Sequence, residues 1–125
     1  MRDSDIVTAR LAGRELATEA GFKGSDLTLI ATAISEVARN IVVYAGIGEI
    51  GLEVLHNANR RGLSVVARDQ GPGIRDVERA MQDGFSTGGS LGLGLPGARR
   101  LMDEFEIESQ VGQGTTITMR KWTRG

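Results

Sequence analysis

Cysteine is absent from the 125-residue chain, and tryptophan and tyrosine each occur once. The absence of cysteine excludes disulfides, thiolate metal sites and a cysteine nucleophile, and it gives no reason to expect an oxidising compartment. The chain also lacks a surplus of either charge, because 15 Lys and Arg face 16 Asp and Glu. Nucleic-acid-binding proteins usually carry a basic surplus, so we expect no nucleic-acid partner.

A long apolar run is missing as well. Residues 1–8 contain no apolar signal core, and no stretch approaches the roughly 18 apolar residues that span a bilayer. We therefore expect a cytoplasmic protein without a membrane partner. The composition, 40% hydrophobic and 25% charged, is that of a soluble globular protein. The length predicts a single domain over residues 1–125.

The clearest periodic pattern predicts a buried helix over residues 26–44, with Ser25 as its candidate N-cap. An amphipathic helix is predicted upstream, from about Ile6 to a stop near Gly21, because glycine readily adopts the left-handed conformation that ends helices. The apolar residues that recur at helical spacing in the longer helix are Leu27, Ile30, Ala31, Ile34, Val37, Ala38, Ile41, Val42 and Ala45.

Beyond the long helix the hydrophobic period changes to two. This pattern predicts strands over residues 50–54 and 63–67, joined as a hairpin. Residues 75–83 and 95–104 are predicted to be helical, and a second hairpin is predicted on either side of residues 112–114. Two helices, a hairpin, two helices and a hairpin predict an α+β sandwich, with helices on one face of a mixed, mostly antiparallel sheet.

Glu36 and Asn40 lie four residues apart on the long predicted helix, so they project from the same side. Their neighbours on that side include Leu29, Ala33 and Val43, and a carboxylate and an amide in apolar company need partners. One interpretation is a polar pair at the edge of a solvated face. The other is a site in which Asn40 gives an oxygen to Mg²⁺ while Glu36 polarises an attacking hydroxyl.

The segment Asp69-Gln70-Gly71-Pro72-Gly73-Ile74 follows the second strand of the first hairpin. Asp69 continues the inward-facing positions of that strand, so its carboxylate should face the core side and require a donor. An adenine amine is a candidate donor, and Gly71 and Gly73 would let the backbone approach the ring. An ordinary turn rich in Asp, Gly and Pro is the alternative.

A glycine-rich segment from Gly88 to Gly97 runs into a predicted helix. Its free backbone N–H groups and the helix dipole suit phosphate binding, whereas a flexible surface loop is the alternative. Gly92, Gly94 and Gly97 also match the dinucleotide fingerprint G-x-G-x-x-G. That match fails in context, because the segment does not follow a first strand and few residues remain for an alternating fold.

Four motifs follow one another along the chain: Glu36-x-x-x-Asn40, Asp69-x-Gly71-x-Gly73, Gly92-x-Gly94 and Gly112-x-Gly114-Thr115. Together they resemble the N, G1, G2 and G3 boxes of the GHKL ATPase superfamily. The resemblance implies a Bergerat two-layer sandwich, in which ATP and Mg²⁺ lie between the helices and a lid at residues 81–91. The implied nucleotide-binding residues are Asn40, which also holds the metal, Asp69, Gly71, Gly73, Gly92, Gly94, Leu95 and Thr115.

Longer strings, at residues 33–41, 83–87, 94–97 and 100–105, are similar to RsbT-type serine/threonine kinases of the stressosome. The resemblance implies transfer of the ATP γ-phosphoryl group to STAS-domain proteins of the RsbS and RsbR type, with Glu36 orienting or deprotonating the acceptor. It also implies that the released protein activates a partner phosphatase of the RsbU type. The chain begins almost directly at its first helix, so the family's short N-terminal strand is expected to be abbreviated.

Two other functions remain as alternatives. A non-catalytic, ATP-gated module would use the lid to sequester a regulator, but the presence of Glu36 favours a kinase. A histidine kinase catalytic domain would need a phosphoacceptor helix, which 125 residues are too few to include. The eukaryotic kinase motifs and G-x-x-x-x-G-K-[ST] are both absent, so the loop and the metal are expected to hold the phosphates.

Overall fold

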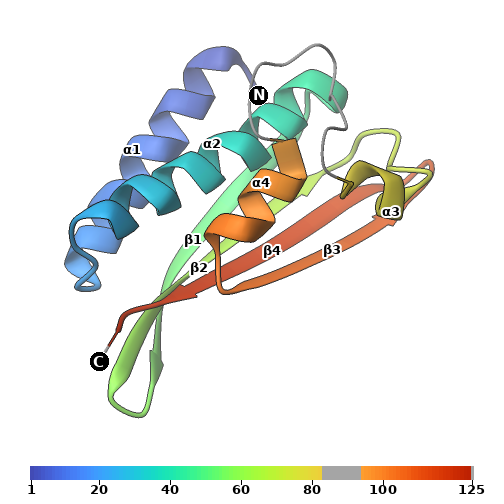
Figure 1. The fold of residues 1–125 in the computed structure, drawn as a ribbon. Coiled ribbons are helices and arrows are strands. Elements are labelled where there is room, and N and C mark those ends of the chain that lie inside the picture. The colour runs from blue at the N-terminus through green and yellow to red at the C-terminus, as the bar shows by residue number, and fades with distance from the viewer. Residues whose placement is uncertain (83–93, 125) are drawn as a thin grey trace.

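The computed structural model describes residues 1–82 and 94–124. Its elements follow the expected order of two helices, a hairpin, two helices and a hairpin (Figure 1). The elements are α1 (Asp3–Glu19), α2 (Ser25–Tyr44), β1 (Gly48–Asn57), β2 (Arg60–Asp69), α3 (Val77–Ala80), α4 (Gly94–Leu101), β3 (Glu104–Gln110) and β4 (Gly114–Trp122).

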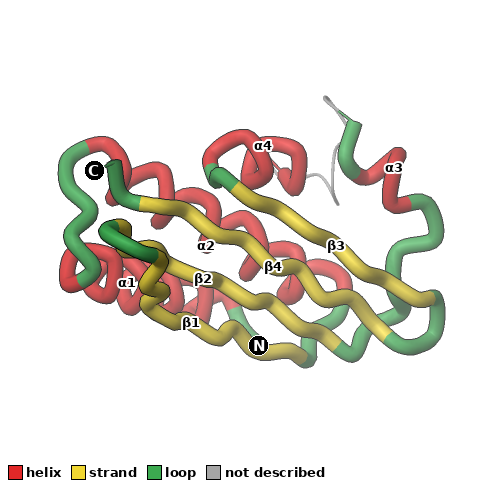
Figure 2. The backbone as a smooth tube through the Cα atoms, turned by 90° about the horizontal axis from the view of Figure 1, so that it is seen from below, coloured by secondary structure: helices red, strands yellow, loops and turns green. Residues whose placement is uncertain are grey.

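The four strands form one sheet in the order β1-β2-β4-β3. All three strand pairs of the described sheet are antiparallel, so the mixed pairing expected from the sequence is not present there. The helices lie on one side of this sheet and leave its other face uncovered (Figure 2). The fold is therefore the predicted α+β two-layer sandwich.

The core lies between α2 and the covered face of the sheet. Alternate residues of the two central strands are fully buried, including Leu63 and Val65 of β2 and Met119 of β4. Ile34 and Ile41 of α2 pack into the same cluster. Burial of side chains of this size stabilises a fold by about 1.5–3 kcal/mol each. The buried residues are those that the period-two and helical patterns of the sequence predicted to face the core.

The helix α2 is long and apolar enough to pass a test for membrane-spanning helices by length and composition. The expectation that no stretch of the chain approaches such a span is therefore too strong. Ten of its residues are buried in the fold, however, and Ile30, Ala33 and Val37 are fully covered by the protein. The apolar character of α2 is explained by its place between α1, α4 and the sheet.

Several helix ends differ from the sequence prediction. Gly24 occupies the N-cap position of α2 and makes no side-chain cap, so Ser25 is the first helical residue and not the cap. The helix α3 has only four residues, and α4 ends at Leu101 instead of residue 104. The buried Lys121 Nζ donates to the Leu101 carbonyl at 2.8 Å, which satisfies the end of α4 before the chain enters β3.

The helix α1 is the first element of the described residues, and no strand precedes it there. At this end the Arg2 backbone N–H donates to the Asp5 carboxylate at 2.7 Å, which satisfies one of the unpaired donors of the first helical turn. The strand β1 is consequently one edge of the described sheet.

Candidate functional site

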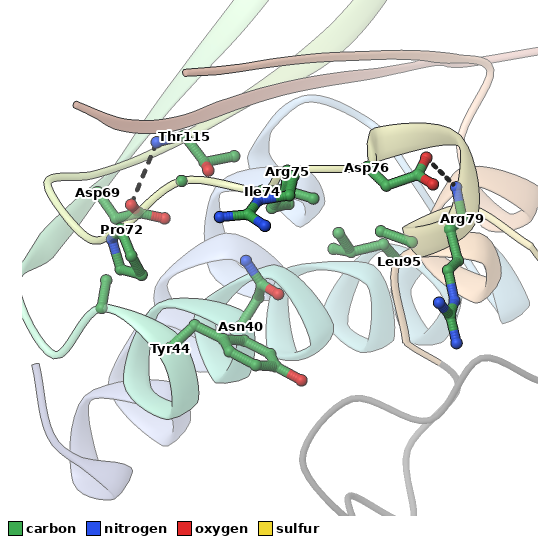
Figure 3. A pocket seen from close by; sticks show the side chains of 13 residues that line it. Asn40, Tyr44, Asp69, Pro72, Ile74, Arg75, Asp76, Arg79, Leu95 and Thr115 are labelled. Atoms are coloured by element: carbon green, nitrogen blue, oxygen red, sulfur yellow. Dashed lines mark hydrogen bonds between the residues drawn. The ribbon is translucent and has the colours of Figure 1, made fainter. Parts of the chain in front are cut away.

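A cavity of about 380 Å³ opens between α2, the loop after β2 and the start of α4 (Figure 3). This volume lies within the range of small-molecule binding sites. Five of the predicted nucleotide-binding residues line it: Asn40, Asp69, Gly73, Leu95 and Thr115. The fold thus gathers residues from three of the four motifs around one space.

Asp69 and Thr115 meet because β2 and β4 pair in the register that sets these two residues opposite each other. The Asp69 Oδ1 atom accepts hydrogen bonds from the Thr115 N–H at 3.2 Å and from the Gly71 N–H at 3.0 Å. Its other oxygen makes no hydrogen bond with the described part of the chain, and Figure 3 shows the carboxylate beside the cavity. The donors that the sequence required for Asp69 are therefore supplied in part by backbone amides. The second carboxylate oxygen remains available to accept a hydrogen bond from a ligand.

Ser109 completes this network, and the sequence motifs gave it no role. Its hydroxyl accepts from the Ile74 N–H at 2.6 Å and donates to the Gly114 carbonyl at 3.2 Å. The Thr115 hydroxyl lies 2.7 Å from it. In the sequence, this role was indicated by the position of Ser109, which is an inward-facing serine at the end of a strand, just before the Gly112-x-Gly114-Thr115 motif. Ser109 fixes the Thr115 hydroxyl and ties the loop after β2 to the β3–β4 turn.

The glycines of the second motif are required by contacts within the protein. A Cβ atom at Gly71 would lie 2.6 Å from the Ala45 Cβ, at the end of α2. At Gly73, where φ is +79°, it would lie 2.3 Å from the Gln110 carbonyl oxygen. The sequence predicted that both glycines allow a close approach of the ligand and a sharp turn; Gly73 has the positive φ of such a turn, and the crowding at both positions is with other parts of the chain itself.

Asn40 is 8% exposed and projects from α2 into the cavity (Figure 3). Its amide group makes no hydrogen bond with residues 1–82 or 94–124. No fully buried side-chain nitrogen or oxygen of the described residues lacks a hydrogen-bond partner, so the Asn40 amide is open to the cavity, where solvent or a ligand can bind it. The position therefore suits a residue that gives an oxygen to a ligand or a metal.

Glu36 lies one helical turn before Asn40 and is also buried, at 7% exposed. One carboxylate oxygen accepts from Arg39 Nη1 at 2.8 Å, and the other accepts from the Gly94 N–H at 2.9 Å. The first interpretation, a pair at the edge of a solvated face, is wrong for these two residues because both are buried. Glu36 connects α2 to the start of α4 and does not line the main cavity.

Some predicted features lie outside the described residues. They include Gly92 and, beyond residue 82, the proposed lid. Gly94 and Leu95 open α4, where Gly94 has a φ of +70° that favours glycine. The polar side chains at the cavity that the motifs did not assign belong to Tyr44, Arg75, Asp76 and Arg79.

No group of three or more His, Asp or Glu side chains suited to a metal gathers among the described residues. The donors at the cavity are instead single polar groups, among them the Asn40 amide, which makes no hydrogen bond with the described residues. This donor set fits a hard cation such as Mg²⁺, which keeps several waters and takes the remaining oxygens from phosphate.

Comparison with known proteins gives consistent matches. A model of the histidine kinase-like ATPase domain matches residues 2–121. The serine/threonine-protein kinase RsbT of Bacillus subtilis (strain 168) is 54% identical over 124 residues, which cover 99% of this chain and 93% of that protein. The anti-sigma F factor of Thermoanaerobacter sp. (strain X514) is 35% identical over 99 residues, or 74% of this chain and 68% of that protein.

Solved structures give the same fold at lower identity. The mycobacterial sensor histidine kinase MprB superposes with a TM-score of 0.60 at 18% identity, covering 97% of this chain and 94% of that one. The catalytic domain of the histidine kinase ThkA gives a TM-score of 0.57, also at 18% identity, over 93% and 90% of the two chains. At this identity the likeness concerns the fold alone.

Proposed function

The chain belongs to the histidine kinase-like ATPase family, in which it is an RsbT-type serine/threonine-protein kinase of stress signalling, and from this premise we propose how its cavity works. We propose that residues 1–125 form one cytoplasmic kinase domain. It transfers the γ-phosphoryl group of ATP to a serine or threonine hydroxyl of a STAS-domain protein. When released from that protein, it activates a partner phosphatase.

The observation that carries the ATP assignment is the half-satisfied carboxylate of Asp69 at the cavity wall. Its Oδ1 atom is held by two backbone amides, at 3.0 and 3.2 Å, which leaves Oδ2 to accept from the adenine amine. The Thr115 hydroxyl, held beside Ser109, supports the same end of the base. A fixed carboxylate accepts from an amine and repels a carbonyl oxygen, so this end of the cavity suits the exocyclic amine of adenine.

Asn40 is the proposed Mg²⁺ ligand. The cation would supply charge neutralisation to the phosphates, and Asn40 would hold it with a single amide oxygen from the floor of the cavity. The amide faces the cavity and makes no hydrogen bond with the described residues, which supports the assignment. Gly71, Gly73, Gly92, Gly94 and Leu95 complete the proposed nucleotide site, with the free N–H groups of the segment that leads into α4 facing the phosphates.

Glu36 is the proposed base or orienting group for the acceptor hydroxyl. Its carboxylate lies one turn from Asn40, so it can reach the side of the phosphates from which an acceptor approaches. Both of its oxygens are engaged in the described conformation, by Arg39 and by Gly94. Each oxygen keeps a second lone pair, which is the proposed acceptor for the hydroxyl proton, while Arg39 and Gly94 hold the carboxylate in place.

The partners follow from the similarity to the RsbT kinase of B. subtilis. STAS-domain proteins of the RsbS and RsbR type are the proposed substrates, and a phosphatase of the RsbU type is the proposed target of the released kinase. Neither a nucleic acid nor a membrane is a proposed partner, since the charge is nearly balanced and the apolar helix α2 is buried in the fold.

Incubation of the protein with γ-labelled ATP, Mg²⁺ and purified STAS-domain proteins tests this function. We expect label on a serine or threonine of the STAS protein, and its loss when EDTA removes the metal. A STAS protein whose candidate acceptor serine is changed to alanine is the matched control. Binding of the STAS protein without any transfer of label would contradict the kinase function.

A non-catalytic, ATP-gated sequestering module is the second candidate. It is favoured by the relatives named anti-sigma F factors, of which one is 35% identical over 74% of this chain. The two functions differ in one readout, since a sequestering module binds its regulator in the presence of ATP and leaves it unmodified. The same labelling experiment therefore decides between them.

A further inference from the structure

Arg75 is a positively charged residue at the cavity to which the proposed function gives no role. Arg75 lines the cavity from the loop between Gly73 and α3, and its side chain reaches into that space (Figure 3). The residue is exposed, so it lies at the opening of the cavity instead of its buried floor.

We propose that Arg75 binds the phosphate chain of the nucleotide, an inference that rests on the proposed ATP site. A guanidinium group offers two parallel N–H donors, which match the spacing of phosphate oxygens and form charge-assisted hydrogen bonds. The chain lacks the lysine of a P-loop, and the proposed Mg²⁺ offsets only part of the charge of the phosphates, so a further cation would stabilise the bound nucleotide. Arg75 is placed to provide it opposite the amide of Asn40.

The other charged groups of the cavity leave Arg75 available. Asp76 caps α3, where its Oδ1 atom accepts from the Arg79 N–H at 3.1 Å. Asp69 is engaged through its Oδ1 atom with the Gly71 and Thr115 amides. Within the described ranges, no hydrogen bond or ion pair engages the guanidinium of Arg75. A ligand anion can therefore bind it without breaking an existing ion pair.

Stacking of the guanidinium on the purine is the competing role. Arginine does stack on aromatic rings, but such contacts contribute only about 0.5–2 kcal/mol and do not use the charge of the phosphates. The base end of the cavity already has its polar contacts from Asp69 and Thr115. An exposed cation at the opening is better matched to the charged and partly hydrated part of the ligand.

A ligand series separates the two roles. The affinities of adenosine, AMP, ADP and ATP are measured by isothermal titration for the wild-type protein and for Arg75→Gln. We expect ADP and ATP to bind at least about 10-fold more weakly to Arg75→Gln, whereas adenosine changes by less than about 2-fold. Arg75→Lys, which keeps the charge but loses the two-pronged donor, is expected to give an intermediate loss.

Arg68→Gln is the matched control. Arg68 lies on the same strand as Asp69 and is exposed, but it lines the uncovered face of the sheet and not the nucleotide cavity. It removes the same charge, and we expect all four affinities to stay within about 2-fold of wild type. Thermal unfolding of each variant confirms that the fold is retained.

Two results would overturn the assignment of Arg75. Equal weakening of adenosine and ATP would show that the residue contacts the purine, and unchanged affinity for ATP in Arg75→Gln would show that it contacts neither part. Failure of the wild-type protein to bind any of the four ligands is a different outcome. That outcome would refute the ATP site itself, and the role of Arg75 with it.

Discussion

At one end of the cavity, Asp69 is held by backbone amides that the β2–β4 register fixes. At the other end, Glu36 and Asn40 are side chains of a single helix, and within residues 1–82 and 94–124 one hydrogen bond, from the Gly94 N–H to Glu36, connects them to α4. The first region, the Asp69 end, is built by the sheet and its loops. At the second, the Glu36 end, the positions of the polar groups depend on side-chain rotamers and on the hydrogen bond between Glu36 of α2 and Gly94 of α4. Recognition of the base is therefore expected to be rigid, whereas the reacting groups keep room to rearrange.

The largest effect is expected at the Glu36 end, in Asn40→Ala. The variant removes the only proposed protein ligand of the metal, and no neighbouring side chain of α2 replaces its amide oxygen. We expect Mg²⁺-dependent phosphotransfer to be abolished, as it is by EDTA in the wild-type protein. Full transfer by the folded variant in the presence of Mg²⁺ would mean that the metal is held elsewhere.

The second effect concerns Glu36→Gln, which keeps the size of the side chain and an oxygen that accepts from the Gly94 N–H. Positioned general bases typically contribute about 100- to 10,000-fold in rate. We expect single-turnover transfer to a STAS-domain substrate to fall by roughly that factor. Transfer at the wild-type rate would remove Glu36 from the chemistry.

At the Asp69 end the expected loss is in binding. Asp69→Asn replaces a charged acceptor of the adenine amine, which is worth about 1.5–3 kcal/mol, or roughly 10- to 150-fold in affinity. The fold should survive, since an amide oxygen still accepts from the Gly71 and Thr115 N–H groups. A titration that gives the wild-type affinity for ATP would exclude Asp69 from recognition of the base.

A last prediction, which concerns stability and not activity, tests the rigidity of the Asp69 end. An alanine at position 114 would place its Cβ 2.1 Å from the Asp69 carbonyl oxygen, at a φ of +123°. We expect Gly114→Ala to lower the free energy of unfolding by at least about 2 kcal/mol. Gly112→Ala is its control, because φ is also positive there but the Cβ meets nothing within 4 Å. Equal losses in the two variants would mean that the contact with Asp69 is not what constrains the turn.

The sequence predicted the fold and the Asp69 end for a physical reason. Hydrophobic periods of 3.6 and 2 report which face of an element is buried, so the long buried helix, the hairpins and the inward-facing Asp69 could be found from local patterns. The ends of α3 and α4 were missed, because Lys121 and the paths of the adjoining loops determine where the last helical turns stop.

Contacts between distant segments could not be predicted from local patterns. Glu36 meets Gly94 across 58 residues, and Ser109 meets Ile74 across 35. Their meeting depends on how α4 packs on α2 and on the β3–β4 register, neither of which has a local signature. The sequence also did not show why positions 71 and 73 require glycine, because a Cβ atom there would collide with Ala45 and Gln110, which are distant along the chain.

The central claim is that the two ends of the cavity have separate tasks, and the affinity of Glu36→Gln for ATP in the presence of Mg²⁺ tests it most directly. An isothermal titration of this variant should give a dissociation constant within about 3-fold of wild type, because the lost base serves the reaction and not the binding. A loss as large as that expected for Asp69→Asn would contradict the account, since Glu36 would then build the nucleotide site itself.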